Sequence, residues 1–328
     1  MSCIRYDLLE RSKLNGFRLV QNLSEPANGP ALRATLDLAY RGRPDLASLK
    51  PVSDEAFTAL EQQLAYSPGP LDATAPVTMT TTEDWIKQRV TINTGYNDER
   101  MDVILFVPRR ARPPFQPVVL FSGTQIFRFP ATVDTLEPGF ASIPVDYIVK
   151  SGRMIVQPVF QGSFERLKTP INSDDPVRMT RSLIEWRWDL GRTLDYLATR
   201  PDVDSARVGY VGLSLGGQNP LPLLAVEHRI KVAVLLSGGL RNDQGTTPFL
   251  DQVNYAPRIK IPVLMVNGRY DEYNPVETSQ LPLFKLLGSA PGEKRHVILE
   301  SGHGSPPRSE ALKETLGWYD KYLGPVSP

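Results

Sequence analysis

The stretch that most constrains this fold lies at residues 207–217, which read Arg-Val-Gly-Tyr-Val-Gly-Leu-Ser-Leu-Gly-Gly. A short run of β-branched and aromatic residues leads into Gly212-Leu-Ser214-Leu-Gly216, and a mostly apolar, helix-like segment follows. Because glycine tolerates the backbone angles of a sharp turn between strand and helix, this spacing presents the Ser214 hydroxyl at the tip of the turn. The pattern predicts a nucleophile elbow with Ser214 as the nucleophile, and a structural turn serine is the alternative interpretation.

The charge and cysteine content exclude several other classes of protein. The chain has 328 residues and a net charge of +1, with no charged block that would attract nucleic acid or a membrane surface. A single cysteine, Cys3, and no Cys/His cluster leave no disulfide framework, and we expect neither a metal nor a cofactor. No apolar run reaches the roughly 20 residues of a transmembrane helix, and the first residues lack the apolar segment of a secretory signal. We therefore expect a cytoplasmic protein.

The hydrophobic pattern from Trp85 onward alternates strands with helices, which predicts a mostly parallel sheet flanked by helices. Residues 1–50 are expected to form an arm and linker, residues 51–84 a helical extension packed on the main domain, and residues 85–328 the α/β domain. In the extension, Ser53 caps a predicted helix, and residues 71–84 are predicted to be loop. Eight strands are predicted, at 88–93, 100–107, 118–121, 154–160, 208–211, 232–236, 263–267 and 296–299.

A serine nucleophile needs a positioned base, and the chain offers three histidines. His303, in Ser301-Gly-His-Gly304, follows the eighth predicted strand, where flanking glycines let its side chain reach across the carboxyl edge of the sheet. His228 ends the helix predicted after the elbow, where a cation suits the helix C-terminus, and His296 begins the eighth strand. His303 is therefore the predicted base, with a solvent-exposed loop histidine as the alternative interpretation.

The acid that orients this base is predicted to be Asp271, which follows the seventh strand in Asn267-Gly-Arg-Tyr-Asp271. An Asx-type turn before Asn274-Pro275 is the alternative role for this aspartate. Asp243 and Asp251 are the other candidates for the acid, and the adjacent Glu272 is expected to point elsewhere. The order serine, aspartate, histidine is the one found in α/β-hydrolases.

Two backbone amides are predicted to stabilise the oxyanion of the reaction. One is the N–H of Leu215, the residue after the nucleophile, and the other is the N–H of Thr124 in the loop after the third strand, with Gln125 as the alternative. The alternative interpretation is that Gly123 only forms a turn. Farther along, Phe127, Phe129 and Phe140 could line an acyl or alcohol pocket or pack in the core. Trp186 and Trp188 are expected to pack on the sheet, with a substrate role as the alternative.

Several stretches resemble bacterial α/β-hydrolases related to dienelactone hydrolases and acetyl-xylan-type esterases, over about residues 50–325. The resemblance is closest to the hydrolase modules at the C-terminal end of serine/threonine-kinase-like multidomain proteins. The stretches are Lys50-Pro-Val-Ser-Asp-Glu55, Ser67-Pro-Gly-Pro-Leu-Asp72, Lys150-Ser-Gly-Arg153, Arg200-Pro-Asp-Val-Asp204, the run from Pro262 to Asp271, and Pro275-Val-Glu-Thr-Ser279.

The resemblance implies a carboxylic ester hydrolase with the triad Ser214, Asp271 and His303. Leu215 departs from it, because close relatives are expected to carry a bulkier aromatic residue there, which changes the shape of the pocket. Residues 1–23 resemble the last strand of a formylglycine-generating-enzyme-type domain through Asn15-Gly-Phe-Arg-Leu-Val20. A remnant of about 20 residues cannot hold that fold, so a truncated product with an N-terminal arm is expected.

These observations predict a serine esterase that acts on small-molecule esters with short-chain or aryl acyl groups, since no basic cluster suits a polyanion. A peptidase or amidase of the prolyl-oligopeptidase kind shares the order of the triad, but no propeller or gating domain is long enough here. The other alternative is a non-catalytic module that senses a ligand. The sequence predicts no oligomeric state.

Overall fold

The computed structural model describes residues 48, 50–127, 129, 145–167, 175–241, 247–304 and 306–326, all within one compact unit that spans Gly42–Pro328. The predictions for residues 1–23 and for most of the N-terminal arm and linker lie outside the described residues. No helix within these ranges is both long and apolar enough to cross a membrane.

The described residues form a sheet of nine strands in the order β1-β2-β3-β5-β4-β6-β7-β8-β9. The first three pairs, from β1·β2 to β3·β5, are antiparallel, and the other pairs are parallel. The strands are β1 Val77–Thr81, β2 Trp85–Asn93, β3 Arg100–Pro108, β4 Pro117–Phe121, β5 Met154–Pro158, β6 Val208–Leu213, β7 Ile230–Leu236, β8 Val263–Gly268 and β9 Lys294–Leu299.

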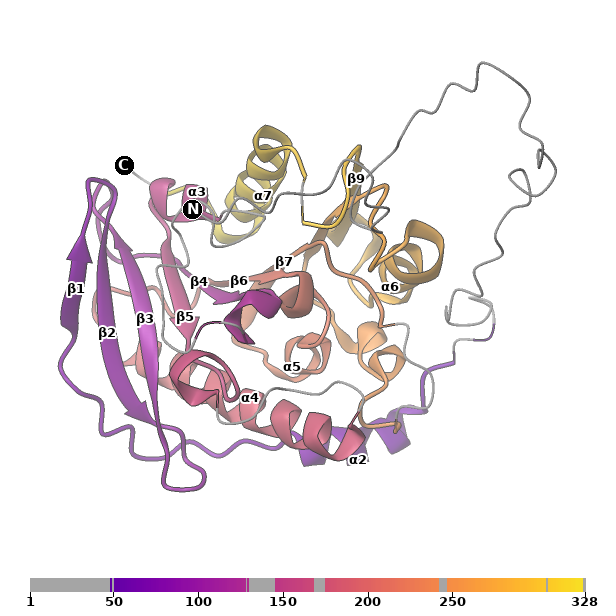
Figure 1. Cartoon of the computed structure of the whole chain (residues 1–328), viewed down its shortest axis with the longest axis horizontal. Helices are drawn as coiled ribbons and strands as arrows, with labels where there is room; N and C mark the ends of the chain where they lie inside the picture. The colour runs from indigo at the N-terminus through magenta and orange to yellow at the C-terminus, as the bar shows by residue number, and fades with distance from the viewer. Residues whose placement is uncertain are drawn as a thin grey trace, which may run out of the picture. The chain divides into compact units, whose positions relative to one another are not determined.

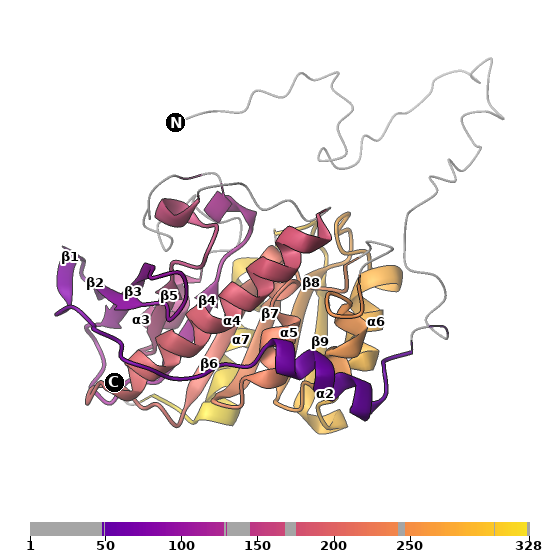
Figure 2. The same cartoon turned by 90° about the horizontal axis from the view of Figure 1, so that it is seen from below.

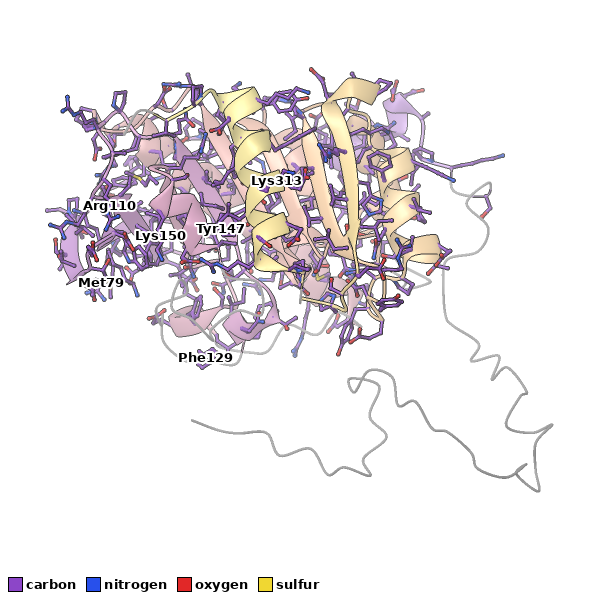
Figure 3. The ribbon with its side chains drawn as sticks, turned by 90° about the horizontal axis from the view of Figure 1, so that it is seen from above. Met79, Arg110, Phe129, Tyr147, Lys150 and Lys313 are labelled. Atoms are coloured by element: carbon purple, nitrogen blue, oxygen red, sulfur yellow. The ribbon has the colours of Figure 1, made fainter. Side chains whose placement is uncertain are left out.

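Strand β1 corrects the predicted count of eight strands, because the sequence assigned residues 71–84 to a loop. All five residues of β1 are exposed, so the strand lacks the alternation of buried and exposed positions by which a half-buried strand is recognised. Met79 lies at the outer edge of the sheet, 41% exposed (Figure 3). Pairing with β2 makes this segment a strand, and each of the eight predicted strands overlaps one of β2–β9.

Helices cover both faces of the sheet. Figure 1 shows α3 and α7 on one face and α4 and α5 on the other. The side chain of Ser53 caps α2 by accepting a hydrogen bond from the N–H of Ala56 at 3.2 Å, as predicted. The helices are α2 Asp54–Gln63, α3 Asp146–Lys150, α4 Pro176–Ala198, α5 Leu221–Val226, α6 Leu281–Leu286 and α7 Arg308–Leu323.

The segment after α2, residues 64–72, runs along α4, and we call it the strap (Figure 2). Tyr66 holds it there, because a methyl group at Gly191 of α4 would lie 2.8 Å from the Tyr66 ring. The guanidinium groups of Arg187 and Arg229 lie 5.1 and 5.9 Å from the centre of the same ring. Cation–π contacts and a close helix–ring approach therefore fix the strap on the helix.

Two kinds of connection meet at the carboxyl edge of the parallel strands. The loops after β4, β6, β7, β8 and β9 leave the sheet at this edge, where ligands bind in open α/β sheets. The turn of the β2–β3 hairpin, residues 94–99, lies at the same edge, because β3 runs antiparallel to β5 with Val103 opposite Pro158. Loops and hairpin turn thus frame one side of the sheet.

Candidate active site

The turn after β6 has the geometry of a nucleophile elbow. Ser214 has a φ of 49°, in the left-handed region that costs free energy for a residue other than glycine. A methyl group at Gly212 would lie 2.1 Å from the carbonyl oxygen of Gly216, and one at Gly216 would lie 2.0 Å from the carbonyl oxygen of Phe121. The Tyr210 hydroxyl donates a 2.6 Å hydrogen bond to the Gly216 carbonyl and braces the turn. Only glycine fits at these two positions, as the spacing predicts.

The structure brings Ser214, His303 and Asp271 together. Ser214 Oγ lies 2.7 Å from Nε2 of His303, and Nδ1 of His303 lies 2.9 and 2.8 Å from the two carboxylate oxygens of Asp271. Asp271 is buried at 2% exposure, while the His303 side chain keeps 17% of its surface exposed. A proton on Nδ1 satisfies the carboxylate and leaves the Nε2 lone pair facing the serine hydroxyl. This geometry would let His303 accept a proton from Ser214.

Asp271 also forms the Asx-type turn that was the alternative interpretation. Its Oδ1 accepts hydrogen bonds from the N–H of Tyr273 at 3.0 Å and of Asn274 at 2.8 Å. The turn fixes the carboxylate while it contacts His303, so one side chain makes both sets of contacts, and its role as the acid stays a prediction. Asn274, buried beneath it, donates from Nδ2 to the carbonyl of Ser237 at 2.8 Å and accepts from Gln218 at 2.8 Å.

Ser237 ties the loop of His303 to the end of β7. This contact was not predicted from the sequence. Ser237 Oγ accepts a 3.2 Å hydrogen bond from the N–H of Gly304, next to His303, and the φ of Ser237 is 51°. A methyl group at Gly238 would lie 2.4 Å from the carbonyl oxygen of Gly217, so the end of β7 packs directly on the elbow. The run Ser237-Gly-Gly directly after a buried strand is the sequence signal that marks this position.

The alternative bases and acids lie elsewhere. His228 is exposed beyond α5, and His296 in β9 pairs through Nε2 with Gln280 Oε1 at 3.2 Å. Burial lowers the pKa of His296 to about 4, which keeps the imidazole neutral. Asp251 Oδ1 accepts from the N–H of Val253 at 3.1 Å, at the start of a 3₁₀ turn. Of the other acids, Glu272 is exposed, and Asp243 lies outside the described residues.

The loop after β4 contacts the elbow, where the oxyanion hole is predicted. A methyl group at Gly123 would lie 3.6 Å from the carbonyl oxygen of Leu213 and 2.6 Å from the side-chain oxygen of Gln125. Thr124 begins a 3₁₀ turn, Thr124–Phe127, and Leu215 lies in the first turn after Ser214. The use of the Thr124 and Leu215 amides stays a prediction.

Tyr273 lies against the imidazole, a contact that no sequence pattern indicated. Its ring centre lies 4.8 Å from that of His303 with the planes tilted by 57°, although 58% of the residue is exposed. An aromatic ring thus lies at the mouth of the site beside the predicted base.

The other predicted aromatic residues are divided between packing and surface. Trp186 is fully buried, with its ring centre 5.1 Å from that of Phe121 and its N–H donating to the carbonyl of Gln161 at 2.9 Å. Phe129 is 37% exposed, and Phe140 lies outside the described residues. Trp186 therefore has a packing role. Within the described ranges, no three His, Cys, Asp or Glu side chains gather closely enough to hold a metal ion.

Comparison with solved structures finds the same fold in esterases. Acetyl xylan esterase 1 from Thermoanaerobacterium sp. JW/SL YS485 superposes with a TM-score of 0.62 at 17% identity, over 86% of this chain and 96% of that one. An acetyl xylan esterase from Paenibacillus sp. R4 has a TM-score of 0.59 at 17% identity, over 84% and 98%. A glucuronoyl esterase from Solibacter usitatus has a TM-score of 0.54 at 14% identity, over 82% and 93%.

No model of a known protein family matches the sequence. The strand order, the crossover helices and these superpositions together establish that the chain has the α/β-hydrolase fold.

Proposed function

We propose that this chain is a serine ester hydrolase that works through an acyl-enzyme. The observation that carries the proposal is the 2.7 Å contact between Ser214 Oγ, on a strained turn, and His303 Nε2. In this reaction the Ser214 oxygen bonds to the ester carbonyl carbon while its proton passes to His303 Nε2. The tetrahedral intermediate then collapses, the bond to the alkoxy group breaks, and His303 returns the proton to the departing alcohol.

Asp271 holds the Nδ1 proton of His303 and stabilises the imidazolium that forms at each proton transfer. The amides of Leu215 and Thr124 donate to the oxyanion. In the second half of the cycle, His303 takes a proton from water, the resulting hydroxide attacks the acyl carbon, and Ser214 leaves with the proton. This chemistry needs only the chain's own residues and water.

The substrates we propose are small esters with short-chain or aryl acyl groups. Structural neighbours whose names describe esterases support hydrolysis of an ester bond. The exposed ring of Tyr273 beside His303 supports an apolar or aromatic group near the reacting bond. The nearer resemblance, to hydrolase modules of kinase-like multidomain proteins, rests on sequence stretches alone and stays a hypothesis.

Two other functions are compatible with the same fold. An amidase or peptidase would use the same three residues, and only its leaving group differs. A non-catalytic sensor would bind an ester or acid without turnover. The buried, doubly hydrogen-bonded carboxylate of Asp271 favours an enzyme, because a binding module has no need of a polarised serine.

The test is a series of p-nitrophenyl esters from acetate to decanoate, with a p-nitroanilide of the best acyl group. Ser214→Ala is compared with Ser205→Ala, which removes an exposed hydroxyl elsewhere. We expect turnover of the short esters, a fall with chain length, little anilide cleavage, and activity only in the wild type and Ser205→Ala. Turnover that survives in Ser214→Ala would refute the nucleophile, and faster anilide than ester cleavage would favour the amidase. No turnover by a folded protein would favour the sensor.

A further inference from the structure

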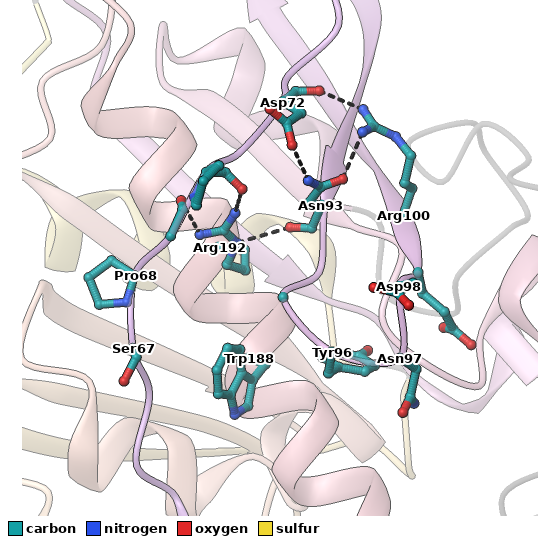
Figure 4. Close-up of a pocket in the computed structure, with 14 residues that line it drawn as sticks. Ser67, Pro68, Asp72, Asn93, Tyr96, Asn97, Asp98, Arg100, Trp188 and Arg192 are labelled. Carbon is teal, nitrogen blue, oxygen red and sulfur yellow. Dashed lines mark hydrogen bonds between the residues drawn. The ribbon is translucent and has the colours of Figure 1, made fainter.

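A pocket of about 680 Å³ lies between the strap, the turn of the β2–β3 hairpin and α4 (Figure 4). None of Ser214, Asp271 and His303 lines it. Its volume is that of ordinary small-molecule sites. The strap contributes Ser67 and Asp72 to the lining, the hairpin turn contributes Asn97 and Asp98, and α4 contributes Trp188.

Two arginines fix the walls of this pocket. Arg192 is 1% exposed and donates to the carbonyls of Asn93 at 2.9 Å, Gly69 at 2.6 Å and Pro70. Arg100 donates to Asn93 Oδ1 at 2.7 Å and to the carbonyl of Asp72 at 2.6 Å. These bonds tie the strap to the sheet edge, so the pocket is formed before any ligand binds.

Several polar groups in the lining have no partner. Within the described part of the chain, the Ser67 hydroxyl, the Asn97 amide, the Asp98 carboxylate and the Trp188 indole N–H make no hydrogen bond to another side chain or to the backbone. Trp188 is half-buried, and a methyl group at Gly95 would lie 2.9 Å from its six-membered ring. An aromatic ring thus lies among free donors and acceptors.

The charges around the pocket do not select an ion. The lining holds two arginines, Arg100 and Arg192, together with the acids Asp72, Asp98 and Glu99, and Glu99 pairs with Arg166 at 3.3 Å. Both lining guanidinium groups are engaged by carbonyl and amide oxygens, so they do not present a free fork to an anion. This lining favours a neutral ligand that uses many hydrogen bonds.

We infer that the pocket is a binding site for a neutral oligosaccharide, separate from Ser214. A sugar offers C–H groups to the indole ring and hydroxyl groups that can both donate to Asp98 and accept from Asn97 and Trp188. The hairpin turn lies at the carboxyl edge of the sheet, and the β3-β5-β4-β6 order puts three strand spacings, about 14 Å, between β3 and the strand before Ser214. The inference does not depend on the reaction at Ser214.

The test is titration calorimetry of the full chain with cellotetraose and xylotetraose, and with choline and gluconate as charged probes. The pocket variant is Asn97→Gly with Asp98→Gly; because both residues have a positive φ, 53° and 51°, glycine keeps the turn. Glu61→Ala on α2 is the matched control, since it removes another exposed acid. We expect the pocket variant to weaken tetrasaccharide binding about tenfold and Glu61→Ala to leave it unchanged.

Trp188→Phe gives a second readout, because it keeps a ring but removes the indole N–H. The chain has four tryptophans, and Trp188 is the one that is not buried. Tetrasaccharide binding should therefore change the intrinsic fluorescence of the wild type but not of Trp188→Phe. Tyr273→Ala, at the other site, should bind as the wild type does. The inference is overturned if neither tetrasaccharide binds, if a charged probe binds more tightly, or if binding survives in the pocket variant and is lost in Tyr273→Ala.

Discussion

Both carboxylate oxygens of Asp271 lie within hydrogen-bonding distance of His303 Nδ1, at 2.9 and 2.8 Å, and the carboxylate is buried. We therefore expect the aspartate to fix both the orientation and the tautomer of the imidazole. The backbone also holds this carboxylate, because Asp271 Oδ1 accepts a hydrogen bond from the N–H of Asn274. Changes at this pair should affect the chemistry more than the fold.

We predict that Asp271→Asn lowers kcat on p-nitrophenyl acetate by about 10³- to 10⁴-fold. An asparagine amide can donate to Nδ1, which moves the proton to Nε2 and removes the acceptor for the Ser214 hydroxyl. Asp251→Asn is the matched control, because it makes the same change at an acid that caps a 3₁₀ turn. Steady-state kinetics beside thermal unfolding separate the two effects, and a loss below tenfold in folded Asp271→Asn would contradict the assigned role.

Gly216→Ala should disrupt the turn at Ser214 and destabilise the fold, because the new methyl group would lie 2.0 Å from the Phe121 carbonyl oxygen. Backbone must move to relieve this contact, and we expect a loss of about 2 kcal/mol or more in the free energy of unfolding. Gly317→Ala in α7 has no atom within 4 Å of the new methyl group and should stabilise the chain by about 0.5–1 kcal/mol. Urea denaturation measures the free energy of unfolding of both variants. Equal changes in the two variants would refute the close approach of Gly216 to the Phe121 carbonyl.

Tyr273 should act on His303 through its ring and not through its hydroxyl. An aromatic pair is worth about 0.5–1.5 kcal/mol, so Tyr273→Ala should lower kcat/KM about 2- to 10-fold while Tyr273→Phe stays near the wild type. The comparison is made on p-nitrophenyl acetate at one pH. A large defect in Tyr273→Phe would instead assign a role to the hydroxyl.

His296 should make the fold less stable in mild acid. Burial lowers its pKa from 6.5 to about 4, so the unfolded chain binds the proton more readily. The contribution of neutral His296 to the free energy of unfolding is complete above pH 6.5, and it is lost as the pH falls from 6.5 to about 4. We expect a loss of about 1–2 kcal/mol, reduced by solvent screening because the imidazole is only partly buried.

The measurement is the free energy of unfolding in urea at pH 7 and at pH 4.5. His296→Phe should lose less stability between these pH values than the wild type, while His228→Phe, which changes an exposed histidine, should lose as much. An equal loss in His296→Phe and the wild type would show that another group senses the acid.

The sequence predicted most of the sheet because buried parallel strands are continuous apolar runs. The stretches that form β6, β7 and β8 are fully or almost fully buried, and serine directly follows both β6 and β7. Strand β1 was not predicted, because its exposed, threonine-rich residues show no pattern of buried positions. Its strand structure depends on pairing with β2, which is a tertiary contact.

The approach of Ser214, Asp271 and His303 to one another could be expected because each lies just after or in the loop after a parallel strand. The support around them could not be expected, since Ser237, Asn274 and Tyr273 act through contacts between loops that lie far apart in sequence. The pocket beside Trp188 was equally hidden, because the strap and the hairpin turn meet only in the folded chain. Local sequence pattern identifies the candidate catalytic residues, whereas the residues that support them are determined by tertiary contacts.

The most direct test of the proposed mechanism is intact-mass spectrometry after treatment with a serine-reactive fluorophosphonate, followed by peptide mapping. The proposal predicts one covalent adduct per chain, located on Ser214, and none on Ser214→Ala. Asp271→Asn should react much more slowly. An adduct on another residue, or no adduct on a folded wild-type protein, would contradict the claim that His303 activates Ser214 as a nucleophile.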